Sequence, residues 1–135
     1  MNIVHLLHAA ARSFPERPAI SVGKETLATY RRFVERVARL AGGLRKITGD
    51  VPGARVAIVA SNSPEYIEVM WAAWHAGLCI VPVNAKLHPK EVAFILENSG
   101  ASACFVSEDL SGGDYLRSIV LGSREYSSAM SAKPS

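Results

Sequence analysis

Cysteine is scarce in this sequence, and its scarcity excludes a fold held together by disulfides. Only two cysteines occur among the 135 residues, Cys79 and Cys104. Both lie inside apolar segments, so we expect two buried, reduced thiols. A disulfide framework would need more cysteines and a secretory context.

Long apolar runs are missing as well. No stretch approaches the roughly 18 consecutive apolar residues that a membrane-spanning helix needs. The moderately apolar start, residues 1–11, is interrupted by His5 and His8 and has no positively charged residues before it, unlike a secretory signal. We therefore expect a cytoplasmic protein without a membrane span.

A large excess of charge of one sign is also lacking. Lys and Arg number 15 and Asp and Glu 12, so the formal net charge is +3. This excess is too small and too dispersed to predict nucleic-acid binding. Because 49% of the residues are hydrophobic, the chain is long enough to form one globular domain with a core.

Motifs that bind phosphate or carry catalysis are missing too. No G-x-G-x-x-G occurs, and Gly23-Lys24-Glu25-Thr26 is unlike a true P-loop because Pro18 stands where that loop has its first glycine. His5 and His8 could face one metal ion from a helix. No third ligand is evident, which favours a structural or surface role. From the residues alone we expect no catalytic residue and no metal site.

What is present is a regular alternation of strands and helices from residue 55 onward. Three apolar, β-branched runs are typical of strands: residues 55–60, 79–83 and 102–106. Ser63 and Pro64 are suited to begin a helix over 64–76, and Pro89 begins another. Short joins and solidly apolar strands predict parallel pairing with both faces covered. The expected fold class is α/β, a parallel-sheet βαβαβ unit with covering helices.

The first half of the chain adds helices and a hairpin to this unit. We expect a helix over residues 3–13, a small hairpin over 19–28, and a helix over 30–46 capped by Thr29. One face of the long helix carries three arginines: Arg32, Arg36 and Arg39. A solvated face is the favoured interpretation, and a phosphate-binding stripe is the alternative. The Gly42-Gly43 pair predicts close packing against a neighbour.

The end of the sequence is less informative. We expect one α/β subdomain over residues 1–121, in which 116–121 form a further strand or a short helix. Residues 122–135 are rich in Ser and poor in large apolar side chains. This composition predicts a loop or linker tail.

Five segments, in order along the chain, resemble motifs of the adenylate-forming acyl-CoA synthetases. The most specific is Trp74-His75-Ala76-Gly77-Leu78-Cys79-Ile80-Val81-Pro82-Val83-Asn84, which is similar to the second core motif of that family. The other four segments are residues 14–20, 27–33, 52–58 and 62–65. In 27–33, Arg32 and Phe33 replace the family's usual Glu and Leu. The resemblance covers residues 3–106 and identifies the N-terminal portion of the large domain of such an enzyme.

The resemblance implies a ligase that joins a carboxylic acid to ATP as an acyl-adenylate, with Mg²⁺, and passes the acyl group to CoA. The family's ATP-binding loop, its acidic segment near Mg²⁺ and its C-terminal lysine lie downstream of the matched region, and these 135 residues hold none of them. No catalytic residue can be assigned. We expect the isolated chain to be inactive, to bind ATP, Mg²⁺ and CoA weakly at best, and to need the remainder of the synthetase as its partner.

One binding residue follows from the resemblance. Lys86, in Asn84-Ala85-Lys86-Leu87, matches a loop beside the family's CoA channel, which implies contact with a CoA phosphate. A solvated surface lysine is the alternative.

A second hypothesis comes from a different class of function. The nearly all-apolar helix over 64–76 would leave an apolar face in need of a cover if the chain stood alone. A free-standing, non-catalytic α/β module that binds a partner protein or CoA, or that self-associates, would meet that need.

Overall fold

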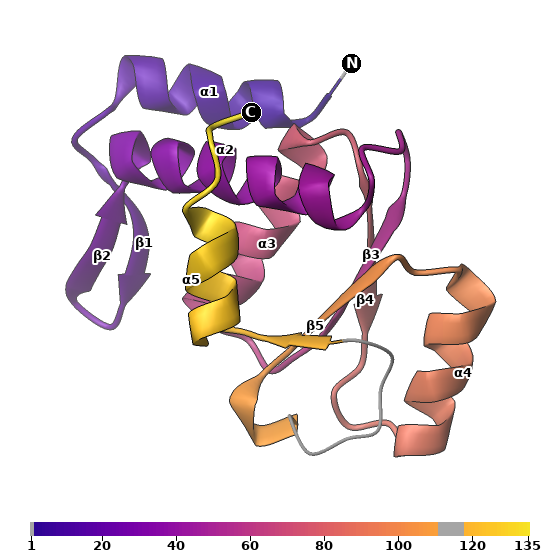
Figure 1. Ribbon diagram of the computed structural model, residues 1–135. Helices are drawn as coiled ribbons and strands as arrows, with labels where there is room; N and C mark the ends of the chain where they lie inside the picture. The colour runs from indigo at the N-terminus through magenta and orange to yellow at the C-terminus, as the bar shows by residue number, and fades with distance from the viewer. Residues whose placement is uncertain (1, 111–117) are drawn as a thin grey trace.

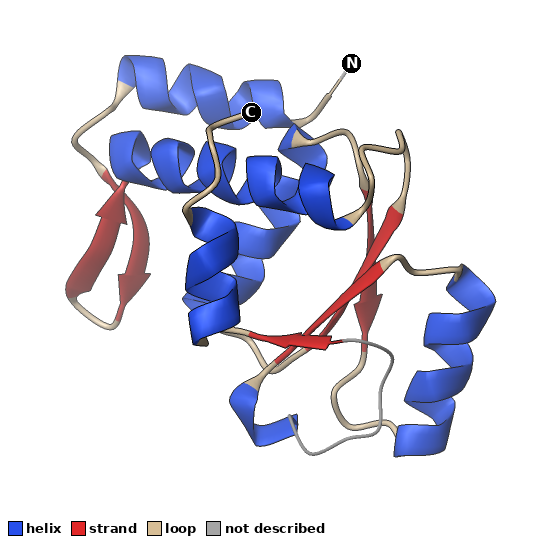
Figure 2. Ribbon diagram, in the orientation of Figure 1, coloured by secondary structure: helices blue, strands red, loops and turns tan. Residues whose placement is uncertain are grey.

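A parallel β-sheet forms the centre of the protein, for which a computed structural model describes residues 2–110 and 118–135. The sheet has four strands in the order β4 (Cys79–Val83), β3 (Arg55–Val59), β5 (Ala103–Val106) and β6 (Ser118–Val120) (Figure 2). All three strand pairs are parallel, with Val59 level with both Val83 and Val106. The predicted parallel βαβαβ unit is therefore confirmed.

Helices cover the two faces of the sheet unequally. On one face pack α2 (Tyr30–Ile47), α3 (Pro64–His75) and α5 (Arg124–Met130), whose side chains form the larger core with Val56, Ile58 and Phe105. On the other face, α4 (Pro89–Ser99) forms a smaller core. Helix α1 (Val4–Ser13) lies along the outside of α2 (Figure 1). The central strands β3 and β5 are buried from both sides, as the solid apolar runs predicted, whereas the edge strand β4 is only partly buried.

The sequence signals for the beginnings and ends of helices are confirmed. The Thr29 hydroxyl accepts a hydrogen bond from the Arg32 N–H, and the Ser63 hydroxyl accepts one from Tyr66. Helix α4 ends at Gly100, whose φ of 67° lies in the left-handed region that favours glycine. The hairpin of β1 (Pro18–Val22) and β2 (Glu25–Thr29) also forms as predicted.

The end of the chain differs from the prediction. Residues 118–120 form the edge strand β6, which decides between strand and helix for this stretch; residues 116–117 lie outside the described part. The expected loop or linker over 122–135 is wrong for Arg124–Met130, which form α5. The Ser123 hydroxyl caps this helix, and Tyr126 anchors it in the core. One buried aromatic residue is too little for a periodic signal in the sequence.

The predicted pair of buried cysteines is half wrong. Cys104 is buried, and burial raises the pKa of its thiol to about 11, so this thiol is inert at neutral pH. Cys79 is exposed, because it begins β4, which is an edge strand of the sheet that the described residues form.

Candidate functional site

The loop after β4 holds the predicted binding residue, Lys86. The Asn84 side-chain oxygen accepts a hydrogen bond from the Lys86 N–H at 2.9 Å, and the Leu87 N–H bonds to the Asn84 carbonyl at 3.2 Å. The loop then leads into α4, where the His88 ring accepts a bond from Lys90 N–H at 3.1 Å. These bonds fix the backbone of the loop, while the Lys86 side chain is exposed.

The Lys86 loop lies at the carboxyl edge of the sheet, where parallel α/β proteins place their ligands. The neighbouring strands β3 and β5 end level with β4, and their exits are joined by a Ser61 N–H bond to the Ser107 hydroxyl at 3.4 Å. Within the described ranges, Lys86 forms no ion pair. Its cation is therefore available to an anionic ligand such as a phosphate.

The structure brings two histidines together that the sequence left apart. The rings of His8 on α1 and His75 on α3 are 5.2 Å apart between centroids. The His75 Nε2 lies 3.0 Å from the Ser135 carbonyl oxygen, and its Nδ1 is buried without a hydrogen-bond partner among the described residues. Burial and the nearby His75, His5 and Arg12 lower the pKa of His8. In the part of the chain that the structure describes, no three His, Cys, Asp or Glu side chains gather as metal ligands.

The favoured interpretation of the arginine face on α2 is wrong for Arg36. Its guanidinium donates two hydrogen bonds, at 2.6 and 3.1 Å, to the carboxylate of Glu68, which is only 4% exposed. The hydroxyl of Tyr126 donates a third bond to the same carboxylate at 2.7 Å. The bond to Glu68 raises the pKa of Arg36, and burial raises that of Tyr126. Sequence reasoning missed this network; its one signal was an acidic residue on an apolar helix.

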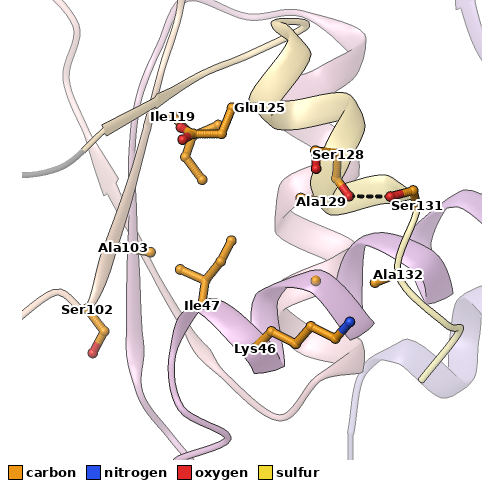
Figure 3. Close-up of a pocket in the computed structure, with 11 residues that line it drawn as sticks. Lys46, Ile47, Ser102, Ala103, Ile119, Glu125, Ser128, Ala129, Ser131 and Ala132 are labelled. Atoms are coloured by element: carbon orange, nitrogen blue, oxygen red, sulfur yellow. Dashed lines mark hydrogen bonds between the residues drawn. The ribbon is translucent and has the colours of Figure 1, made fainter.

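A cavity of about 590 Å³ opens between α2, α5 and the β5–β6 side of the sheet. Ile47, Ala103 and Ile119 form its apolar part, and Lys46 and Glu125 stand on opposite sides (Figure 3). This cavity lies away from the Lys86 loop, because Ser102 and Ala103, at the amino end of β5, line it, whereas Lys86 follows the carboxyl end of β4. The structure therefore does not bring Lys86 and the cavity into one site.

In the described residues, no helix is both long and apolar enough to cross a membrane. The described residues form a parallel α/β unit in which Lys86 is an exposed cation on a fixed loop at the carboxyl edge of the sheet.

Comparison with known protein families identifies the family to which this unit belongs. The model of the AMP-binding enzymes, described as "AMP-binding enzyme", matches residues 7–131. Since this match spans nearly the whole chain, the protein belongs to the AMP-binding enzyme family.

Curated relatives include acyl-CoA synthases and ligases. The chain is 44% identical over 92 residues to a feruloyl-CoA synthase of an Amycolatopsis species, a match that covers 68% of this chain and 18% of the relative. It is 34% identical over 99 residues to a fatty acid–[acyl-carrier-protein] ligase of Streptomyces coeruleorubidus, covering 73% and 19%. The chain therefore spans about a fifth of the length of these two relatives.

Solved structures share the fold over nearly all of the chain. A protein described as a long-chain-fatty-acid CoA ligase of Rhodopseudomonas palustris superimposes with a TM-score of 0.85 at 29% identity, covering 99% of this chain and 37% of that one. A benzoate CoA ligase of Burkholderia xenovorans gives 0.87 at 21% identity, covering 100% and 29%, which supports the fold alone. The predicted family and fold class are confirmed.

Proposed function

We propose that this chain supplies the N-terminal α/β part of an ATP-dependent acyl-CoA synthetase. In such an enzyme a carboxylic acid reacts with ATP to give an acyl-adenylate and pyrophosphate, and the acyl group then passes to the thiol of CoA. The main support is the family match over residues 7–131. The chain covers only 18% of the feruloyl-CoA synthase to which it is similar. The full activity then requires segments beyond these 135 residues.

The first test concerns adenylate formation. These residues hold no Ser/Thr/Gly-rich loop with a lysine that could cradle ATP phosphates, so the purified chain is expected to be inactive. The measurement is exchange of radiolabelled pyrophosphate into ATP, with Mg²⁺ and a panel of aromatic and fatty carboxylic acids. A complete ligase serves as the positive control. Exchange that depends on the added acid would show that the chain activates carboxylates by itself.

Lys86 is proposed as a contact for a phosphate of CoA. Support comes from its exposed cation, which has no ion-pair partner among residues 2–110 and 118–135, on a loop that Asn84 holds in place at the carboxyl edge of the sheet. The lysine ammonium group is a point charge on a flexible side chain, which suits contact with a phosphate. The fixed backbone of the loop limits the range of positions that this group can occupy. In the isolated chain this contact is solvated and weak, because one exposed pair contributes about 1 kcal/mol at most.

The Lys86 contact can be measured by titrating the isotope-labelled chain with CoA and following amide chemical shifts. We expect millimolar CoA to shift the amides of residues 84–88, and Lys86→Glu to weaken binding about fivefold, the equivalent of about 1 kcal/mol. Lys90→Glu is the matched control, since Lys90 is also exposed and lies one turn away on α4. Equal effects of the two substitutions would reduce Lys86 to a general surface charge.

A second candidate function is a non-catalytic module that binds a partner protein or its own copy. Large apolar side chains on separate helices favour it: Leu6 is 68% exposed and Phe94 66%. Exposed apolar side chains of this size promote association. Static light scattering over a range of concentrations tests this function, and a strict monomer at high concentration would contradict the self-associating form.

A further inference from the structure

The His75 ring has one buried nitrogen that makes no hydrogen bond within the part of the chain that the structure describes. This atom, Nδ1, lies in the last turn of α3. A buried polar atom without a partner costs free energy, and in native proteins it commonly marks the place of a water or an ion. The surroundings of the ring therefore indicate what this nitrogen is suited to bind.

The other nitrogen of the same ring determines where the hydrogen is. The His75 Nε2 lies 3.0 Å from the backbone oxygen of Ser135. Because an oxygen of this kind only accepts, Nε2 carries the hydrogen, and in the neutral ring Nδ1 carries a lone pair. Histidines that bind metals are commonly held in this way, with one nitrogen bonded to a backbone carbonyl and the other on the metal.

A second imidazole stands beside this one. The ring of His8, on α1, lies 5.2 Å from that of His75 between centroids, and the two planes are tilted by 59°. Zinc binds an imidazole nitrogen at about 2.0–2.1 Å, which puts the ring centroid about 3.2 Å from the ion. Two imidazoles at a tetrahedral angle around one ion then have centroids about 5.2 Å apart. Ordinary ring packing allows the same distance, but it leaves the lone pair of Nδ1 unused.

The two histidines belong to helices that other contacts hold together. The Asn2 side chain donates to the Trp74 carbonyl, and its oxygen accepts a bond from the Val4 N–H at 3.0 Å, so the start of α1 is tied to the end of α3. His8 is half-buried, and α1 lies along the outside of α2 (Figure 1). An ion can therefore enter from solvent and keep water as its remaining ligands.

The groups around His8 determine the state of its ring and limit the strength of the site. Burial, His75, His5 and Arg12 all lower the pKa of His8, so its imidazole is neutral at neutral pH, as a metal ligand must be. Among the described residues, no third His, Cys, Asp or Glu side chain completes a set of ligands. We therefore expect affinity in the micromolar range, weaker than that of a closed structural zinc site.

We propose that His8 and His75 bind a divalent transition-metal ion such as Zn²⁺ between α1 and α3, through His75 Nδ1 and one nitrogen of His8. Imidazole nitrogens suit such ions, whereas Mg²⁺ and Ca²⁺ prefer oxygen ligands. The ion fastens the first helix of the fold to α3. Because His75 precedes the amino end of β4, the site lies at the sheet edge opposite the Lys86 loop and is independent of the proposed synthetase function.

The chemical shifts of the imidazole nitrogens test the site directly. The chain, isotope-labelled at histidine and carrying Cys79→Ser to remove an exposed thiol that also binds zinc, is titrated with ZnCl₂ at a pH of about 7.5. We expect His75 Nδ1 and one nitrogen of His8 to shift, the rings of His5 and His88 to stay unchanged, and MgCl₂ to shift none of them. Zinc that shifts only His5 or His88, or no histidine, would overturn the proposal.

Substitutions measure how much each ring contributes. We expect His8→Asn and His75→Asn each to weaken Zn²⁺ binding at least about tenfold by calorimetry, and the double variant to lose little more, since both rings bind the same ion. The control is His5→Asn, which is exposed on the same helix and should bind zinc as before. Equal losses in His5→Asn and His8→Asn would indicate an adventitious ion only, on the surface of α1, and would overturn the proposal. The spectra of the unsubstituted rings decide the matter where a variant fails to fold.

Discussion

Glu68 is a charge inside the protein, and its two partners determine the cost of each change around it. The carboxylate is 4% exposed and accepts bonds from Arg36 and from Tyr126. A buried pair adds little stability over an apolar replacement, because both charges lose their hydration. Removal of one partner is different, since the other charge then stays buried and uncompensated.

Arg36→Met is therefore expected to destabilise the protein although its side chain is partly exposed. The loss of a buried pair's partner costs about 3–5 kcal/mol, and the exposure of Arg36 lets water reach the site, so we expect about 2 kcal/mol here. Urea denaturation followed by circular dichroism measures the change. The control is Arg39→Met on the same helix, which is exposed and should change stability by less than about 0.5 kcal/mol. Equal losses in the two variants would contradict the assigned role of Glu68.

His8 makes the stability of the protein depend on pH. Its pKa in the folded chain is lowered from 6.5 by burial and then by His75, so the unfolded chain binds the proton more readily. The free energy of unfolding is therefore complete above pH 6.5 and falls as the pH drops below it. We expect urea denaturation at pH 7.5, 6.5 and about 5.5 to show this loss, and His8→Asn to reduce it.

The control for this pH effect is His5→Asn, which lies on the same helix and is exposed. The His5 variant should keep most of the dependence between pH 7.5 and about 5.5, a window above the carboxylate titrations. If His8→Asn kept the full dependence, another group would have to carry it.

At the scale of single residues, the sequence predicted where a residue lies better than it predicted which distant residue it contacts. Asn84 and Lys86 fall on the loop where the motif predicted them, and Ser63 caps the helix that its spacing indicated. The role of Arg36 could not be predicted, because its partner Glu68 is 32 residues away and nothing local separates Arg36 from Arg39. The contact of Lys86 with CoA remains a proposal.

At the scale of elements, β4 is an edge strand whose sequence prevents it from pairing with the edge of another sheet. The Cys79 N–H donates to the Ala54 carbonyl at 2.9 Å, so the backbone N–H and C=O groups of alternate β4 residues point toward β3. The backbone groups of the other two residues, Ile80 and Pro82, point toward the free edge. Pro82 has no N–H to offer there. A proline at such a position blocks the pairing of one edge with another.

Pro82→Val is expected to increase association through this edge. The variant adds one N–H donor per chain, and two extra backbone hydrogen bonds across a symmetric pair of edges amount to about 1–2 kcal/mol, or roughly a tenfold rise in association. Light scattering over a concentration series measures it. Ile80→Val, at the other edge-facing position, keeps its N–H and serves as the control. An unchanged association constant in Pro82→Val would mean that the edge is covered in some other way.

Elements whose stability is local were predictable, and the element that depends on distant contacts was not. Strands β3, β4 and β5 and helices α2, α3 and α4 follow from apolar patterns and caps within each segment. Helix α5 can pack here because Gly43, more than 80 residues earlier, leaves space for its backbone at Ala129. Ser-rich composition gave the opposite indication, since helix propensity is weak beside such tertiary contacts.

At the scale of the whole molecule, the helices on the two faces of the sheet pack against it through cores of different size. Helices α2, α3 and α5 share one continuous core with the sheet, whereas α4 is held mainly by Val92 and Leu96 against β3 and β4. The central strands β3 and β5 belong to both cores. We therefore expect α4 to open locally while the rest of the molecule stays folded.

Amide hydrogen exchange tests this hierarchy: α4 amides should exchange at least about tenfold faster than those of β3 and β5. Two core substitutions sharpen the test, each expected to cost about 2–4 kcal/mol or somewhat less for valine. Val37→Ala lies in the α2 core, which stays intact when α4 opens, so it should speed exchange in β3 and leave α4 unchanged. Leu96→Ala removes a contact that is lost in both openings, so it should speed exchange in α4 and β3 alike. If Val37→Ala accelerated α4 and β3 equally, the molecule would open only as one cooperative unit, because α4 would then have no opening that spares the larger core.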